Sequence, residues 1–173
     1  ECTTYSPVRR TGFTVHIFSC GRFPRFAIGA SLLTATYCVS ESLRMLAKWK
    51  ASHFFKKHSV QFLNAKGKQS APFYFFDNKP HECSQTWQVV RSEFDQMMLD
   101  NAREHGVDAQ EGVHVLDVIF DGDRAVGVHI KDADGTRREV RAQVVVDARG
   151  QAAMLQNRFK KRVWDPVLNK GGN

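Results

Sequence analysis

The chain of 173 residues carries a formal net charge of +7 and is 42% apolar and 25% charged, a composition typical of a globular domain. No apolar run approaches the roughly 20 residues that a membrane span requires, and the first residues lack the basic start and apolar stretch of a signal peptide. A cytoplasmic protein without a membrane partner is therefore expected. Because the first residue is Glu1 rather than Met, the chain is expected to be processed or a fragment.

The basic and sulfur-containing residues give no motif for nucleic acid or metal. Short basic clusters lie far apart and lack interleaved aromatics, which disfavours a nucleic-acid-binding module. The cysteines form no C-x-x-C pair, so reduced thiols are the simplest interpretation. His81, Glu82 and Cys83 are consecutive, but neighbouring strand residues face opposite ways, which disfavours a metal site.

Hydrophobic periodicity in the first half of the chain predicts one strand, one helix and a hairpin. Residues 12–18 alternate apolar and polar side chains as a strand does, and residues 33–48 have helical spacing. Residues 60–63 and 72–76 indicate the two strands of a hairpin. The second of these strands carries four consecutive aromatics, which fit a sheet core, one wall of a substrate pocket, or both.

The second half predicts a strand at 85–90, a helix from Ser92 to Gly106 and a three-stranded meander. The meander strands are expected at 113–120, 125–130 and 139–142. Residues 144–146 are all valine, which is typical of a parallel strand buried on both faces. We expect this strand to lie beside residues 12–18, parallel to them in one sheet.

Four stretches, in this order, resemble the flavin-dependent halogenases. Residues 12–26 give a strand followed by R-F-P-R-F, and residues 28–33 (I-G-A-S-L-L) are similar to the family's I-G-E-S-L-L-P. Residues 88–95 (Q-V-V-R-S-E-F-D) resemble Q-V-x-R-x-x-F-D. Residues 144–150 (V-V-V-D-A-R-G) resemble V-V-D-A-S-G. The relatives of this family include FAD monooxygenases and geranylgeranyl reductases.

The resemblance implies an α/β fold: a partial Rossmann-like FAD-binding domain with an antiparallel β-meander and the start of a substrate domain. Residues 12–56 and 91–165 would belong to the FAD-binding domain, and residues 57–90 would be substrate-domain strands. Residues 1–11 are left unassigned, and 166–173 are expected to be a truncated tail. The N- and C-terminal parts of the family's domain are expected to be missing.

The resemblance also implies cofactor contacts, here at Ser19, Arg22, Gly29, Ser31, Arg91, Asp147 and Gly150. Arg91 at a helix start can bind phosphate or sugar oxygens, or form a surface ion pair with Glu93 or Asp95. Asp147 can bind a nucleotide at a strand end or cap a helix. Gly150 would allow close approach of the backbone to the cofactor.

Lys57 is the catalytic candidate that the resemblance implies. Residues 57–62 (K-H-S-V-Q-F) resemble the family's K-x-G-A-x-F segment. In such enzymes reduced flavin and oxygen convert halide to hypohalous acid, which meets the lysine and halogenates an electron-rich ring. The side chain of Lys57 is then expected to face a cavity between residues 73–76 and the helix from Leu33, while Lys56 faces away. The alternative is that Lys56 and Lys57 form an exposed pair beside a strand.

Several departures from the family pattern affect the expected cofactor binding. Residues 1–173 contain no G-x-G-x-x-G, the motif whose helix N-terminus holds the pyrophosphate. Ser19 replaces the acid that binds the adenosine ribose, Ala30 replaces the Glu of I-G-E-S, Thr34 replaces the Pro, and Arg149 replaces a small residue. We therefore expect residues 1–173 alone not to retain FAD and to be inactive.

The function predicted on this resemblance is that of an FAD-dependent oxidoreductase, most similar to a halogenase acting on an aromatic or phenolic substrate. The expected partners are that substrate, a halide and a separate flavin reductase, with no nucleic acid. An FAD monooxygenase, a geranylgeranyl-reductase-like enzyme and a non-catalytic truncated remnant remain the alternatives.

Overall fold

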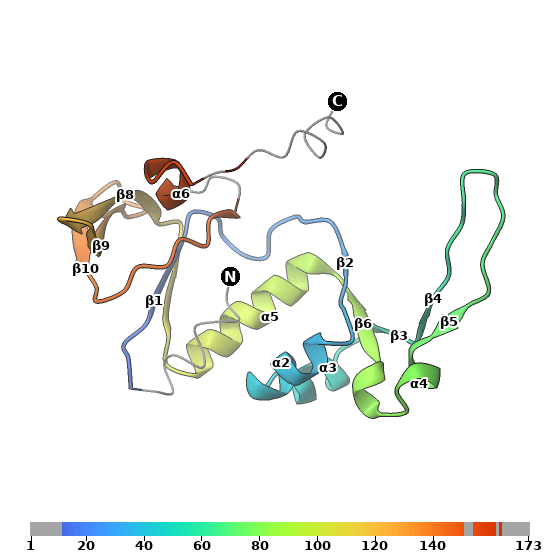
Figure 1. The fold of residues 1–173 in the computed structure, drawn as a ribbon. Coiled ribbons are helices and arrows are strands. Elements are labelled where there is room, and N and C mark those ends of the chain that lie inside the picture. Colours follow the sequence, from blue (N-terminus) through green and yellow to red (C-terminus); the bar gives the residue numbers. More distant parts are fainter. Residues whose placement is uncertain (1–11, 151–153, 162, 164–173) are drawn as a thin grey trace. The chain divides into compact units, whose positions relative to one another are not determined.

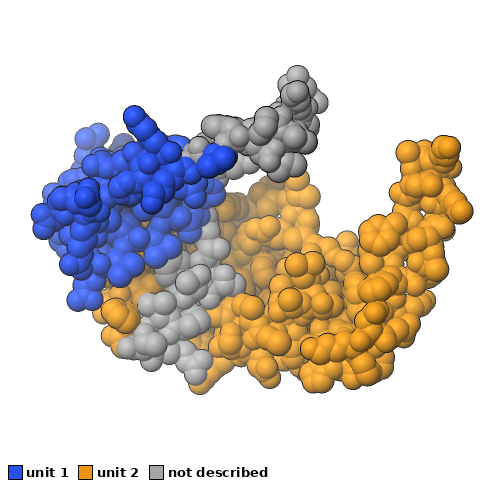
Figure 2. All heavy atoms as spheres, viewed as in Figure 1, with its two compact units in different colours: residues 1, 112–173 blue, residues 2–111 orange. Residues whose placement is uncertain are grey.

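The computed structural model describes residues 12–150, 154–161 and 163 (Figure 1). The chain divides into two compact units, residues 2–111 and residues 112–173 with residue 1, which Figure 2 colours separately. The predicted unassigned start at 1–11 and tail at 166–173 lie outside the described residues. The predicted functional domain boundaries stay a prediction, since compactness alone does not assign them.

The first unit is built on a small antiparallel sheet with β6 (Thr86–Val89) between β2 (Ala30–Ser31) and β3 (Phe55–Lys57). Three helices accompany it: α2 (Thr36–Ser42), α3 (Leu46–Ala51) and α5 (Arg91–Glu104). A short 3-10 helix, η1 (Glu82–Ser84), precedes β6. No helix in the described part of the chain is long and apolar enough to cross a membrane.

The core of this unit lies against one face of β6. Trp87 and Val89 alternate on that face and are each 3% exposed. They belong to one buried cluster with residues of all three helices, among them Tyr37, Trp49 and Met98. Thr86 and Gln88 point to the other face by strand alternation. The sheet thus has one face covered by the apolar core, while the other face carries polar side chains.

The helix predicted for residues 33–48 is two helices in the structure. The chain leaves α2 at Leu43 and passes through Arg44, whose φ of 58° is in the left-handed region. The Met45 N–H donates a hydrogen bond to the Ser40 carbonyl over 2.8 Å, which ends the helix. Leu43 and Met45 are both buried as a result, an arrangement that one straight helix would not give.

The predicted hairpin is present but its strands are shorter than expected. β4 (Ser59–Val60) pairs with β5 (Phe73–Tyr74), and α4 (Phe75–Asn78) follows at once. The hairpin extends away from helices α2, α3 and α5 (Figure 1). Phe73, Tyr74 and Phe76 are each about half exposed. The interpretation of these aromatics as a sheet core is therefore wrong.

The predicted pairing of residues 12–18 with 144–146 is wrong. β1 (His16–Ser19) forms its parallel ladder with β7 (Asp108–Glu111), which begins after α5. Residues 144–146 form no strand in the described structure, and Val144 is 72% exposed. A parallel strand needs neighbours to bond its backbone, and in the described part of the chain none pairs with these valines.

The meander in the second unit is as predicted. β8 (His114–Asp121), β9 (Arg124–Lys131) and β10 (Arg137–Arg141) pair antiparallel in the order β10-β9-β8. A short helix, α6 (Met154–Arg158), follows in the chain. The mixed helix and strand content confirms the predicted α/β class.

Gly127 in β9 is expected to be irreplaceable. A Cβ atom at this position would lie 2.5 Å from the Val140 carbonyl oxygen and 3.1 Å from the Arg141 Cα, both backbone atoms of β10. Because a paired strand cannot move aside without losing its ladder, Gly127→Ala should destabilise the protein by about 3 kcal/mol. Urea unfolding measures the change.

Gly122→Ala is the control for this substitution. Gly122 has a φ of +57° and no atom within 4 Å of a built Cβ. This variant should lose only about 1 kcal/mol, the cost of a left-handed backbone for a side chain. Equal losses in the two variants would contradict the steric explanation for Gly127.

Candidate functional site

Ser31 and Lys57 meet on the face of the sheet that carries polar side chains. Ser31 pairs with Gln88 and Lys57 pairs with Thr86, so all four side chains share one face of the sheet. The Lys57 Nζ donates a hydrogen bond to the Ser31 Oγ over 2.8 Å. It also lies 5.6 Å from the ring centroid of Phe75, within range of a cation–π contact.

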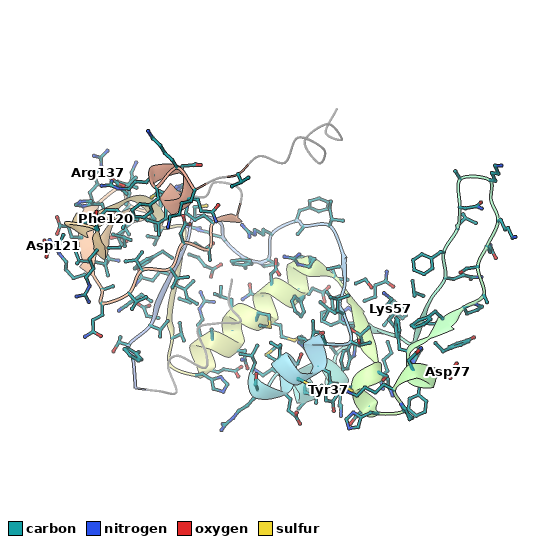
Figure 3. All side chains as sticks on the ribbon, viewed as in Figure 1. Tyr37, Lys57, Asp77, Phe120, Asp121 and Arg137 are labelled. Atoms are coloured by element: carbon teal, nitrogen blue, oxygen red, sulfur yellow. The ribbon has the colours of Figure 1, made fainter. Side chains whose placement is uncertain are left out.

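The two adjacent lysines differ in environment. Lys57 is half-buried, whereas Lys56 is exposed and is directed to the other side of β3 by strand alternation. Figure 3 shows Lys57 where the sheet meets the β4–β5 hairpin. Of the walls predicted for it, the aromatic segment contributes Phe75, while Leu33 is 72% exposed. The catalytic role of Lys57 stays a prediction.

Gly29 and Arg91 lie at one end of the same sheet. Ala30 pairs with Val89, so the residues that precede β2 and follow β6 are neighbours. A Cβ at Gly29 would lie 3.4 Å from the Val89 carbonyl oxygen, at the limit of ordinary van der Waals contact. The Arg91 Nε and Nη2 each lie 3.1 Å from a carboxylate oxygen of Asp95. The predicted alternative for Arg91, an ion pair with Asp95, is therefore what the structure contains.

Ser19 and Arg22 lie at the carboxyl end of β1, the edge at which parallel sheets bind nucleotides. Ser19 pairs with Glu111, the last residue of β7. The carboxylate of Glu111 accepts the Phe23 N–H and a guanidinium N–H of Arg103, the latter over 2.7 Å. Glu111 thereby ties the loop after β1 to the end of α5.

Sequence reasoning missed Glu111, and the chain offered little signal for it. Residues 108–111 read D-A-Q-E, which has neither the alternation nor the β-branched residues of a typical strand. The strand forms because its backbone completes the ladder of β1.

Glu111 should make stability depend on pH. The Arg103 guanidinium, with a smaller contribution from the Phe23 N–H, lowers the pKa of Glu111 from its ordinary value of 4.5. Since the pKa is lower in the folded state, the carboxylate stabilises the fold above pH 4.5, and this stabilisation is lost as pH falls through the folded-state pKa. The stabilisation by the Glu111 carboxylate is about 1 kcal/mol after allowance for its partial exposure.

Thermal unfolding between pH 7 and pH 3 tests this dependence in wild type and Glu111→Gln. The variant should have a lower Tm at pH 7 and a shallower fall of Tm on acidification. Parallel curves for the two proteins would show that Glu111 does not contribute.

Asp147 and Gly150 belong to the second unit. The two carboxylate oxygens of Asp147 accept the Arg149 N–H at 3.2 Å and the Leu155 N–H, in the first turn of α6, at 2.9 Å. Of the two predicted roles for Asp147, helix capping is the one with contacts in the structure. Gly150 has a φ of +63° with open space around it. Cofactor contacts of both residues stay a prediction.

The chain matches no family model, but it is similar to curated halogenases. It is 35% identical over 150 residues to 1H-pyrrole-2-carbonyl-[peptidyl-carrier protein] brominase of Pseudoalteromonas luteoviolacea, covering 87% of this chain and 35% of the relative. It is 33% identical over 163 residues to a flavin-dependent halogenase of Armillaria mellea, covering 92% and 32%. The chain thus spans about a third of the length of these relatives.

Solved structures agree with these sequence comparisons. The myxobacterial chondrochloren halogenase, described as a variant of FAD-dependent halogenases, superposes with a TM-score of 0.78 at 33% identity, over 85% of this chain and 34% of that chain. Over most of its length the chain is therefore similar to FAD-dependent halogenases. A flavoprotein/dehydrogenase of Cytophaga hutchinsonii has a TM-score of 0.85 at 33% identity, over 95% of this chain and 40% of that one.

The side chains at the carboxyl end of β1 have the chemistry that FAD contacts require, and the contacts themselves stay a prediction. The donor set at the carboxyl end of β1 includes the Ser19 hydroxyl and the exposed guanidinium of Arg22, both suited to sugar or phosphate oxygens. Gly29 presents bare backbone beside β6. In the part of the chain that the structure describes, no cluster of His, Cys, Asp or Glu could hold a metal.

Proposed function

We propose that the protein carrying these residues is an FAD-dependent halogenase that acts on an electron-rich aromatic ring. The observation that carries the proposal is the amine of Lys57, held between Ser31 and Phe75 on the polar face of a sheet whose end bears Gly29 and Arg91. The similarity to brominases and halogenases supports it.

Candidate FAD contacts are proposed separately for each compact unit. Ser19, Arg22, Gly29 and Arg91 are the proposed contacts from the first unit, and Asp147 and Gly150 are those from the second. Bound, reduced FAD would supply, together with oxygen, the oxidising power that converts halide to hypohalous acid. Arg91 already pairs with Asp95 through Nε and Nη2. A contact between Arg91 and the cofactor would therefore use the rest of the guanidinium group.

Lys57 would deliver the halogen to the substrate. As an ammonium, its amine can donate a hydrogen bond to the oxygen of hypohalous acid and orient it. As a neutral amine, it can attack the halogen, forming a nitrogen–halogen bond and releasing hydroxide, which takes the proton from nitrogen and leaves as water. The aromatic carbon then takes the halogen from nitrogen, and the proton that the ring loses goes to that nitrogen, which restores the neutral amine. Either route needs the amine at a fixed place.

The proposed partners are a halide, an aromatic or phenolic substrate and a separate flavin reductase that supplies reduced FAD. We place the protein in the cytoplasm, where reduced cofactors are made and where exposed thiols such as Cys20 and Cys38 stay reduced. Residues 12–56 and 91–165 are proposed to serve the cofactor, and residues 57–90 to line the substrate site.

A different FAD oxidoreductase is the second candidate. The structural likeness to the Cytophaga hutchinsonii flavoprotein/dehydrogenase favours it. A probable FAD-dependent monooxygenase of Pseudomonas aeruginosa, with a TM-score of 0.77 at 18% identity, shares the fold. A monooxygenase would add an oxygen atom to the substrate instead of exchanging hydrogen for halogen.

Product mass distinguishes the two candidates. The protein is supplied with FAD, a flavin reductase, reduced nicotinamide, oxygen, and chloride or bromide, together with a panel of phenols, indoles and pyrroles. A halogenase yields products with the isotope pattern of chlorine or bromine. Oxygenated products without halogen, or reduced products, would overturn the proposal.

A further inference from the structure

The position of Ser31 relative to Lys57 follows from the way two strands flank β6. β2 and β3 pair with opposite edges of β6, so their backbones are about 10 Å apart. Ser31 lies opposite Gln88, and Lys57 lies opposite Thr86, two residues away on the same face. The lysine side chain therefore crosses the face of β6 to place its amine on the serine hydroxyl, 2.8 Å away.

The other hydroxyl on this face is engaged elsewhere. Thr86 lies directly opposite Lys57 but is 1% exposed, and its Oγ1 donates to the Leu33 carbonyl over 3.2 Å. Phe75 approaches the amine with its ring but offers no directional lone pair. Ser31 is thus the neighbour that can fix the direction of the amine.

A serine hydroxyl also suits a lysine that changes its protonation state. The oxygen accepts from an ammonium, and the rotatable O–H can donate to a neutral amine. The same contact can therefore persist while the amine takes up a halogen and gives it away. An alanine at this position would leave the amine held by the ring of Phe75 alone among the contacts described above.

We propose that Ser31 is a positioning residue for Lys57 rather than a cofactor ligand. The serine holds the amine across the polar face of β6. This inference rests on the proposed role of Lys57 in halogen transfer. It assigns the serine of the I-G-A-S segment to the lysine, 26 residues away in sequence.

Amine acylation tests the contact without cofactor or substrate. The protein is treated with a limiting amount of a water-soluble acetylating reagent, and the modification rates of Lys57 and Lys56 are compared by mass spectrometry. Ser31→Ala should raise the rate at Lys57 about five-fold, the ratio expected for losing one hydrogen bond. Ser31→Thr keeps a hydroxyl and should restore the wild-type rate, and Lys56 should not change in either variant.

A second readout connects the contact with the reaction. With FAD and halide supplied, Ser31→Ala should lower halogenated product per flavin oxidised, and Ser31→Thr should recover it. An unchanged Lys57 acylation rate in Ser31→Ala, or an equal rise at Lys56, overturns the positioning role. Retained halogenation in Lys57→Ala would instead refute the proposed function, so the two failures are distinguishable.

Discussion

Replacing Lys57 by alanine is expected to reduce halogenation by at least about 100-fold, because the amine that receives or orients the hypohalous acid is removed. Oxidation of reduced flavin should continue at the wild-type rate, since Lys57 is not among the proposed cofactor contacts. The measurement is halogenated product by mass spectrometry, together with flavin oxidation followed by absorbance. Product formation at the wild-type rate would show that Lys57 has no catalytic role.

Lys56→Ala is the matched control for this experiment. It removes the same side chain from the adjacent position of β3, but Lys56 is exposed and directed to the opposite side. Halogenation should therefore be unaffected. Lys57→Arg separates the two routes for the lysine: an arginine can still donate hydrogen bonds, yet it stays protonated and cannot attack a halogen. Activity in Lys57→Arg would favour the hydrogen-bonding route.

Trp49→Ala is expected to destabilise the first unit by about 3–5 kcal/mol, the usual cost of truncating a large buried aromatic. Trp49 is 4% exposed, and its ring lies 5.5 Å from Trp87 and 5.4 Å from Phe94, centroid to centroid. The substitution would leave a cavity between α3, β6 and α5. Urea unfolding followed by circular dichroism measures the loss.

Two further variants show whether burial causes this loss. Phe62 is 66% exposed on the hairpin, so Phe62→Ala should change stability by no more than about 0.5 kcal/mol. The buried Trp49 Nε1 has no hydrogen-bond partner in the described structure, so Trp49→Phe removes an unsatisfied donor along with some volume. Trp49→Phe should therefore be clearly more stable than Trp49→Ala. A loss in Phe62→Ala as large as that in Trp49→Ala would contradict the proposed core.

Elements with strong local signals were predictable from the sequence. The meander follows from apolar alternation and from turns at Asp121-Gly122 and Asp132–Gly135, and all three strands lie close to the predicted residues. The long helix α5 ends next to Gly106, whose φ is 80°, as predicted for a glycine stop. The ordered motifs likewise sufficed to indicate the halogenase family.

Strand pairing, in contrast, was not predictable from local sequence signals. β1 pairs with the polar strand β7, whereas the three valines at 144–146, a strong strand pattern, pair with nothing in the described structure. Strand pairing depends on backbone groups of a partner far along the chain, and side-chain periodicity does not identify that partner. The division into α2 and α3 at Arg44 is also a tertiary outcome, because it buries Leu43 and Met45 together.

The contacts at the candidate site were decided in the same way. The sequence placed Ser31 and Arg91 among cofactor contacts because their segments match family motifs. In the folded chain Ser31 bonds the amine of Lys57 and Arg91 is paired with Asp95. The first of these contacts exists because β6 brings β2 and β3 together on its two edges, and the second because α5 places residues four apart on one side of a helix. A motif fixes which residue types are present, while the direction of each side chain follows from the strand or helix that carries it.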